Sequence, residues 1–248
     1  MLKIEIKEVK LKKGRTILKN IICELLPNNV YSIVGKNGTG KTTFIKSITS
    51  LLDKNIYYVD GKVLFNGKDI LSMNQKEIAG IRKAKIKYVF QDAINSFDPL
   101  KTFKFYFKKI SKEENGIDML LDYFLLPSKK KLYEMYPYEV SGGMAQRINF
   151  ILALSAEPEL IILDEPTSGI DSAIANLFIE KIREFAKMKN NAVILVTHDL
   201  SFAQKVSDAT AFLSNNNLTG FIGVKDFLKQ DHNHELQSIL NSYSQLIS

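Results

Sequence analysis

Apolar and polar positions alternate with a period of two through the first part of the chain. Apolar residues alternate with charged ones over residues 2–7, and residues 30–34 form a short apolar run that ends at Gly35. Such alternation, and short apolar runs bounded by turn residues, predict β-strands, so residues 1–34 should consist of strands and turns. After a glycine-rich turn, the spacing of apolar residues predicts a helix from about 41 to 52.

Strand-like alternation returns over residues 56–70, which contain two dipeptides typical of tight turns, Asp60-Gly61 and Asn66-Gly67. Both favour two-residue hairpins, because aspartate, asparagine and glycine tolerate the positive φ angles that such turns need. We therefore expect an N-terminal antiparallel β subdomain that combines this segment with the first strands.

The second half of the chain alternates buried strands with an amphipathic helix. Residues 160–163 and 192–197 are continuous apolar runs, as found in parallel strands covered on both faces. Between them, residues 172–188 place five apolar side chains on one helical face: Ile174, Leu177, Phe178, Ile182 and Phe185. This order predicts a right-handed crossover in an α/β fold with a mainly parallel sheet. Helical spacing over about 92–155 predicts a helical subdomain inserted into that core.

The composition is that of an ordinary globular protein: of 248 residues, 45% are hydrophobic and 25% are charged. Disordered, collagen-like and coiled-coil architectures are therefore poor explanations. We expect a single domain over residues 1–224, followed by a polar, helical tail at 225–248. The only cysteine, Cys23, excludes internal disulfides and cysteine-built metal sites, and its apolar neighbours predict a small buried hydrophobe.

The N-terminus has the alternation of a strand and not the apolar core of a signal peptide. No apolar stretch approaches the roughly 20 residues that a membrane span needs. We therefore expect an intracellular protein whose contact with a membrane is peripheral. The net charge of +7 fits nucleic acid, an anionic membrane surface or a phosphorylated ligand, and it equally fits a lysine-rich surface without a partner.

A glycine-rich segment between a predicted strand and a predicted helix matches the pattern G-x-x-x-x-G-K-[ST]. It consists of Gly35, Lys36, Asn37, Gly38, Thr39, Gly40, Lys41 and Thr42, and we call it the phosphate loop. Its glycines let successive N–H groups point at phosphate oxygens, and the start of the next helix adds positive charge. Lys41 is expected to reach the β- and γ-phosphates, and the Thr42 hydroxyl to ligate Mg²⁺.

Two adjacent acids, Asp164 and Glu165, end the apolar strand at 160–163. Ligands of open α/β sheets bind at the carboxyl ends of strands, and neighbouring strand residues point to opposite faces. The two carboxylates should therefore have different roles. We expect Asp164 to hold Mg²⁺ together with Thr42, and Glu165 to polarise the attacking water. The alternative for Asp164 is a plain helix cap.

Three further segments occur around these two motifs. Ser141-Gly142-Gly143 precedes the acidic pair, Gln91 follows one apolar strand and His198 follows another. The five motifs together resemble those of the ATP-binding subunit of ABC transporters, over the whole predicted domain. The resemblance implies a P-loop NTPase core of the ABC ATPase type, with a mainly parallel sheet, an N-terminal antiparallel β subdomain and a helical insertion.

The resemblance also implies an enzyme, an ATPase that converts ATP and water to ADP and phosphate with Mg²⁺ as cofactor. Its catalytic residues are then Glu165, His198 as a donor to the γ-phosphate, and Gln91 beside the metal and the attacking water. The implied metal ligands are Thr42, Gln91 and Asp164. The implied nucleotide-binding residues are Gly35, Lys36, Asn37, Gly38, Thr39, Gly40, Lys41, Thr42, Thr43, Ser141, Gly142 and Gly143. Of these, the last three serve ATP held by the other subunit of a head-to-tail dimer.

The signature from Ser141 to Arg147 has Met144 where most ABC proteins carry glutamine, and it is similar to one subunit type of the peptide and nickel importers. This subfamily implies a heterodimer with a second ABC ATPase subunit, two membrane permease subunits and an extracytoplasmic substrate-binding protein. The chain should then lie at the cytoplasmic face of the cell membrane, with no nucleic acid partner. The cargo is a nickel ion or metal chelate, or an oligopeptide, and the short C-terminal part favours the nickel type.

The helical insertion is expected to form a groove near Gln91 for the membrane subunits. Its docking candidates are Phe97, Asp98, Tyr106 and Tyr136, and each of the three aromatic residues could equally be a core residue.

Two other features lie outside the family pattern. Lys12 or Lys13 stands where the family has an adenine-stacking aromatic, which predicts modest nucleotide affinity or base selectivity. Histidines and acids alternate at residues 231–235, where a solvated surface is favoured over a metal site.

Two other function classes stay open. A soluble ABC ATPase that acts on ribosomes or DNA would use the positive charge, although such chains usually carry two cassettes. A nucleotide-binding regulatory subunit would not hydrolyse ATP, and the presence of Glu165 and His198 argues against it.

Overall fold

The structure is a computed structural model that describes residues 1–110, 116–188 and 190–227. An antiparallel sheet forms its N-terminal part, with one face of β1 buried at Leu2, Ile4 and Ile6 as the alternation predicts. The described strands of this sheet have the order β2-β1-β4-β5. Their bounds are β1 Leu2–Leu11, β2 Thr16–Leu25, β4 Tyr57–Phe65 and β5 Lys68–Asp69.

The two predicted hairpin signals have different outcomes. Asn66-Gly67 forms the turn between β4 and β5, with positive φ angles of 50° and 81°. A hairpin at Asp60-Gly61 was a wrong prediction, because β4 runs through both residues and the pairing register with β1 shifts beside them. Gly61 has a φ of 152°, and a Cβ there would lie 2.3 Å from the carbonyl oxygen of Glu5. This glycine therefore allows a close approach of two strands, where the sequence suggested a turn.

A second, mostly parallel sheet carries the rest of the fold, which confirms the predicted α/β class. Among the described residues it has seven strands, in the order β10-β9-β3-β8-β7-β6, with β11 also paired to β9. The contacts β9–β3, β3–β8, β8–β7 and β7–β6 are parallel. Their bounds are β3 Val30–Val34, β6 Ile86–Val89, β7 Leu160–Asp164, β8 Ala192–Thr197, β9 Ala209–Ser214, β10 Asn217–Leu218 and β11 Ile222–Gly223.

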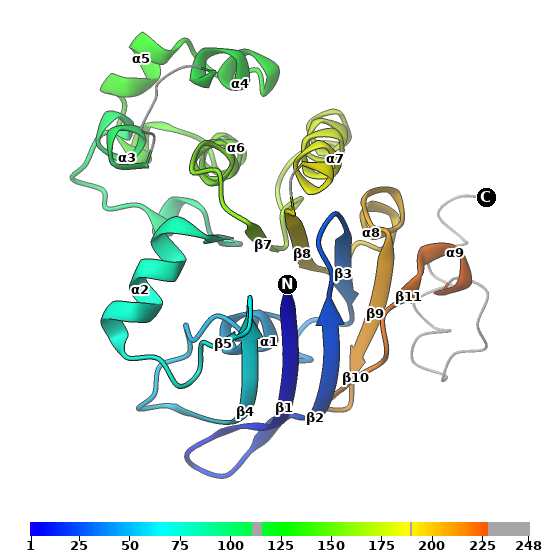
Figure 1. The fold of residues 1–248 in the computed structure, drawn as a ribbon. Helices are drawn as coiled ribbons and strands as arrows, with labels where there is room; N and C mark the ends of the chain where they lie inside the picture. Colours follow the sequence, from blue (N-terminus) through cyan, green and yellow to red (C-terminus); the bar gives the residue numbers. More distant parts are fainter. Residues whose placement is uncertain (111–115, 189, 228–248) are drawn as a thin grey trace.

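Both faces of this sheet are buried, which explains why its strands are continuous apolar runs. In β7, Leu160 and Ile162 face a core shared with the antiparallel sheet, while Ile161 and Leu163 face a core shared with helices. Helix α1 (Lys41–Ser47) contributes Phe44 to the first core, and it is shorter than the predicted helix. Figure 1 shows the antiparallel sheet at one end, the main sheet in the middle and the helical part beyond it.

The remaining helices flank the main sheet or form the predicted insertion between β6 and β7. The flanking helices are α2 (Gln75–Ala84), α7 (Ser172–Lys187), α8 (Leu200–Val206) and α9 (Val224–Phe227). The insertion contains α3 (Phe103–Ile110), α4 (Ile117–Tyr123), α5 (Lys129–Glu134), α6 (Gly142–Ser155) and two short 3₁₀ helices, Ile94–Ser96 and Pro137–Glu139. Its packing onto α7 centres on Phe124, Phe150 and Phe178, whose rings contact one another. The insertion is thus joined to the core by aromatic contacts.

Of the predicted docking aromatics, Phe97 is a core residue: it is 8% exposed and its ring packs edge-on against Phe103 and Tyr106. Tyr106 and Tyr136 are partly exposed. Within the described ranges, no helix has both the length and the apolar character to cross a bilayer. Most of the predicted tail, including the alternating histidines and acids, lies outside the described residues.

Candidate active site

The phosphate loop connects β3 to α1 at the carboxyl edge of the main sheet. Gly38 and Gly40 have φ angles of 81° and 102°, which disfavour any residue with a Cβ. A Cβ at Gly35 would lie 2.5 Å from the carbonyl oxygen of Leu213, so this glycine lets the loop pass close to β9. The sequence thus places glycines where the backbone needs them.

The Lys41 side chain donates hydrogen bonds to the backbone of the phosphate loop. Its Nζ donates to the carbonyl oxygens of Gly35 at 2.8 Å and Lys36 at 3.1 Å, and it lies 3.4 Å from Oε1 of Glu165. The side chain is only 6% exposed. A buried cation held by carbonyls and a carboxylate is positioned to exchange these partners for an incoming anion.

Asp164, at the end of β7, accepts hydrogen bonds on both carboxylate oxygens. The Thr42 hydroxyl donates to Oδ1 at 3.0 Å, and the Tyr88 hydroxyl donates to Oδ2 at 2.8 Å. Asp164 is 3% exposed, and this burial raises the pKa of the carboxyl above its ordinary value although the two hydrogen bonds act to lower it. The alternative role as a helix cap is wrong, because Asp171 caps the following helix, α7.

Glu165 follows β7 with a positive φ of 47°, so its side chain takes a different direction from that of Asp164. Its Oε2 lies 2.9 Å from Nδ1 of His198 and accepts a hydrogen bond from the backbone N–H of the same residue at 3.2 Å. The imidazole of His198 is thus held through Nδ1. Two carboxylates that are adjacent in sequence therefore have separate partners.

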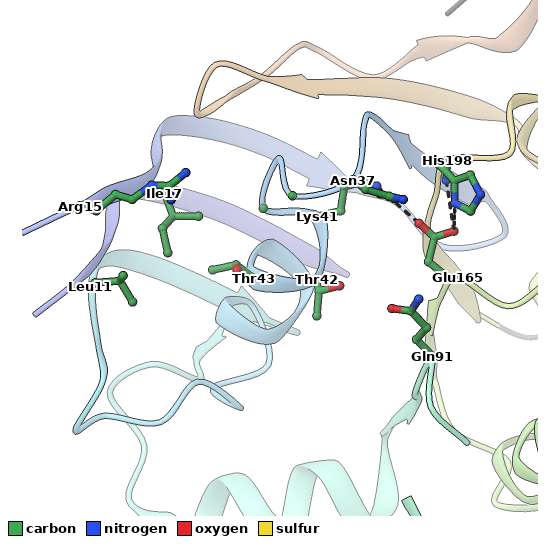
Figure 2. A pocket seen from close by; sticks show the side chains of 12 residues that line it. Leu11, Arg15, Ile17, Asn37, Lys41, Thr42, Thr43, Gln91, Glu165 and His198 are labelled. Atoms are coloured by element: carbon green, nitrogen blue, oxygen red, sulfur yellow. Dashed lines mark hydrogen bonds and ion pairs between the residues drawn. The ribbon is translucent and has the colours of Figure 1, made fainter. Parts of the chain in front are cut away.

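A cleft of about 390 Å³ brings these groups together. Figure 2 shows Lys41, Thr42, Gln91, Glu165 and His198 around one end of it. Residues from distant parts of the sequence therefore meet at one edge of the sheet. The full lining consists of Leu11, Arg15, Ile17, Asn37, Gly38, Gly40, Lys41, Thr42, Thr43, Gln91, Glu165 and His198.

The predicted site residues fall into three groups. All three predicted catalytic residues and much of the phosphate loop line the cleft. Gly35, Lys36 and Asp164 do not line it but hold side chains that do, through the contacts given above. Thr39 does not line it either, and its hydroxyl donates to the carbonyl oxygen of Lys36 at 2.9 Å. Ser141, Gly142 and Gly143 lie outside it, at the N-terminus of α6, where the Ser141 hydroxyl accepts from the N–H of Met144. They lie at least partly exposed to solvent.

The opposite end of the cleft differs from the sequence expectation. Lys12 and Lys13 are exposed in a turn and do not line it, whereas Leu11, Arg15 and Ile17 do (Figure 2). These three residues were missed because the wall comes from the end of β1, from Arg15 just before β2, and from β2 itself, on either side of the turn. Tyr88 was missed as well, although alternation in β6 could have placed it on the face of the sheet that carries Asp164.

The described residues contain no group of three or more histidines, cysteines and acids that could enclose a metal ion.

A sequence model of the ABC transporter family matches residues 18–168. The chain belongs to the ABC transporter family. As an ABC ATPase it binds and hydrolyses ATP. The matched segment contains the phosphate loop, Gln91, the Ser141–Gly143 segment and both acids of the β7 strand end.

Two relatives of this ABC ATPase are named as peptide transporters. It is 31% identical to the dipeptide transport ATP-binding protein of Bacillus subtilis over 92% of this chain and 71% of that protein. It is 29% identical to the oligopeptide transport ATP-binding protein of Lactococcus lactis, with 93% and 71% covered. A solved dimeric structure of a bacterial ABC transporter cassette is similar in fold, with a TM-score of 0.77 and 23% identity over 90% of this chain and 99% of that one.

Proposed function

We propose that this ABC ATPase powers the import of short peptides, as the peripheral ATP-hydrolysing subunit on the cytoplasmic face of a membrane complex. The observation that carries the proposal is the cleft, in which a lysine, a threonine, a glutamine, a glutamate and a histidine from four segments converge. Each is the residue type that one step of phosphoryl transfer to water requires.

ATP binding starts with the phosphate loop. Its glycine-rich backbone and the N-terminus of α1 attract the phosphates, and Lys41 leaves the carbonyls of Gly35 and Lys36 to pair with the β- and γ-phosphate oxygens. Asn37, Gly38, Gly40, Thr42 and Thr43 line the same end of the cleft. The base lies toward Leu11, Arg15 and Ile17, where it meets aliphatic side chains and a guanidinium.

The donor set beside the loop fits Mg²⁺. Thr42 and Asp164 present hydroxyl and carboxylate oxygens 3.0 Å apart, and hard divalent cations prefer oxygen ligands. A buried carboxylate with a raised pKa also gains from a nearby cation. Thr42, Asp164 and Gln91 would hold the ion, which neutralises charge on the phosphates when bound.

Hydrolysis then depends on Glu165, which we infer orients the attacking water and accepts its proton. Its contact with Lys41 must open first, which happens when Lys41 turns to the phosphates. His198, held through its Nδ1 contact with Glu165, presents Nε2 as the ring nitrogen that would donate to the γ-phosphate. Gln91 faces the same space and would help to orient the water.

A second ABC ATPase subunit completes the site. The N-terminus of α6 exposes Ser141 and Gly142, and small residues at a helix start let N–H groups approach an anion closely. We infer that these residues, with Gly143, contact ATP held by the partner of a heterodimer. Closing the dimer on ATP and opening it after hydrolysis supplies the motion for transport.

Two permease subunits would receive that motion, and an extracytoplasmic binding protein would deliver the cargo. The helical insertion exposes Leu100, Phe105 and Tyr138, and Phe90 is exposed beside Gln91 in the sequence. We infer that these large apolar side chains dock a membrane subunit. Phe97, which is buried, is no longer part of this surface.

Peptides are the cargo favoured by the relatives, since both named proteins are peptide transporters. Uptake of nickel or a metal chelate stays a prediction from the sequence. The two cargoes are separated by measuring uptake of a labelled tripeptide and of labelled Ni²⁺ in cells that lack this chain. The cells are complemented with wild type, with Glu165→Gln, or with Glu180→Gln as a control on the exposed side of α7.

Tripeptide uptake should fall in the deletion strain and return with wild type and Glu180→Gln but not with Glu165→Gln. Nickel uptake should stay unchanged. If nickel uptake falls in the deletion strain and tripeptide uptake does not, the cargo is nickel and not a peptide. Equal complementation by Glu165→Gln would favour a regulatory subunit, and unchanged uptake of both would favour the soluble class.

A further inference from the structure

The proposed function leaves one polar contact beside the cleft without a role, the hydrogen bond from Tyr88 to Asp164. Tyr88 lies on β6, one strand away from Asp164 on β7. The two strands are parallel neighbours in which Tyr88 pairs with Ile162, two residues before Asp164. Ile162 and Asp164 share one face of β7, so a long side chain from Tyr88 on that face reaches the carboxylate.

The rest of the environment fixes the ring in place. Tyr88 packs against the core between the two sheets, and its ring contacts that of Phe90 at a centroid distance of 4.4 Å. The ring is therefore held by apolar contacts while the hydroxyl reaches Oδ2 of Asp164 at 2.8 Å. Tyrosine combines both properties, and phenylalanine would keep only the packing.

The two carboxylate oxygens of Asp164 have different hydrogen-bond donors. Oδ1 accepts from Thr42, the residue proposed to ligate the metal, while Oδ2 accepts from Tyr88 on the other side. With Asp164 only 3% exposed, water cannot readily replace a lost donor. The Tyr88 hydroxyl therefore limits the rotation of the carboxylate and keeps Oδ1 turned toward Thr42.

We propose that Tyr88 is a positioning residue for the metal, which acts through Asp164 and sets how strongly the cleft binds Mg²⁺ together with ATP. This inference rests on the proposed Mg²⁺ site. Loss of an outer partner of a metal ligand typically lowers metal affinity by about 10- to 100-fold. Because Asp164 keeps its bond to Thr42, we expect the lower end of that range, about tenfold.

The test compares Tyr88→Phe with Tyr123→Phe in the full purified chain. Tyr123 is a matched control, because its hydroxyl also contacts a carboxylate, Oε2 of Glu180 at 2.7 Å, but on the helices away from the cleft. ATP binding is measured in EDTA and over a Mg²⁺ titration, and melting without nucleotide reports on stability.

Tyr88→Phe should bind ATP in EDTA like wild type and need about tenfold more Mg²⁺ for the half-maximal increase in affinity. Tyr123→Phe should match wild type in both. In an Asp164→Asn background, the further change Tyr88→Phe should leave the Mg²⁺ dependence unaltered, because the route through the carboxylate is already lost.

An unchanged Mg²⁺ dependence in Tyr88→Phe would overturn the inference while leaving the Mg²⁺ site intact. So would an equal loss of affinity in EDTA, or a variant that does not fold, because both point to a structural role. If Mg²⁺ does not affect ATP binding by wild type, the metal site itself fails and the inference fails with it.

Discussion

We predict that replacing Glu165 by glutamine separates catalysis from binding in this ABC ATPase. The amide has the size of the carboxylate but cannot accept a proton. A positioned general base contributes about 10²–10⁴-fold to the rate, so hydrolysis should fall by that factor, equivalent to about 3–5 kcal/mol in the activation barrier.

The same change alters the empty protein in a predictable way. Lys41, 3.4 Å from Glu165 and almost fully buried, loses its charged partner but keeps the carbonyls of Gly35 and Lys36. Breaking a buried ion pair costs about 3–5 kcal/mol, and the remaining hydrogen bonds reduce this to about 1–3 kcal/mol. The melting temperature without nucleotide should then fall by about 2–10 °C. ATP should restore it, because the phosphates give Lys41 a new partner.

The assay combines phosphate release at saturating Mg²⁺ and ATP, binding of a fluorescent ATP analogue, and melting with and without ATP. Glu180→Gln serves as the control, since that side chain is exposed and away from the cleft. The reasoning is refuted if hydrolysis falls by less than about tenfold, below the range for a general base. It is equally refuted if ATP binding is lost together with hydrolysis.

Three further predictions follow from individual residues. Gly61→Ala should lower the free energy of unfolding, measured by urea denaturation, by about 2–4 kcal/mol, because the added Cβ would meet the backbone of Glu5. The control Gly80→Ala, in open space on α2, should raise it by up to about 1 kcal/mol, and equal effects of the two changes would contradict the close approach at Gly61. Burial raises the pKa of the Cys23 thiol to about 12, so only about one thiol in ten thousand is ionised at pH 8. Iodoacetamide should therefore modify Cys23 far more slowly in the folded than in the unfolded protein, and equal rates would refute this prediction. Burial also raises the pKa of the Asp164 carboxyl, so its ionised form destabilises the nucleotide-free protein as the pH rises. Asp164→Asn should therefore raise the melting temperature at pH 8, and this increase should become smaller at acid pH. A melting temperature at pH 8 below that of wild type would contradict the prediction.

The parts of the site that sequence predicts well are those whose chemistry is local. The phosphate loop combines its glycines, lysine and threonine in eight consecutive residues. Asp164 and Glu165 follow an apolar run, and the rule that ligands bind at the carboxyl ends of parallel strands places them without knowledge of the fold. The burial of both β7 faces follows from the same apolar run.

The parts that were missed depend on contacts between segments far apart in the sequence. Tyr88 reaches Asp164 because β6 and β7 pair in one register, and no local pattern specifies that register. Leu11, Arg15 and Ile17 line the cleft because the paired ends of β1 and β2, on either side of the turn that carries Lys12, lie opposite the phosphate loop. At Gly61 the local signal for a hairpin is outweighed by pairing with β1, where tertiary context decides.

The central claim, that hydrolysis in this cleft drives peptide import, is tested most directly on the assembled membrane complex. The complex is isolated through a tag on this chain, reconstituted in liposomes with wild type or Glu165→Gln, and assayed for ATP hydrolysis and tripeptide uptake together. We predict that wild type hydrolyses ATP faster when the peptide and its binding protein are present, that peptide accumulates only with ATP, and that Glu165→Gln abolishes both. Peptide accumulation that continues with Glu165→Gln, or ATP hydrolysis without any peptide accumulation, would contradict the account.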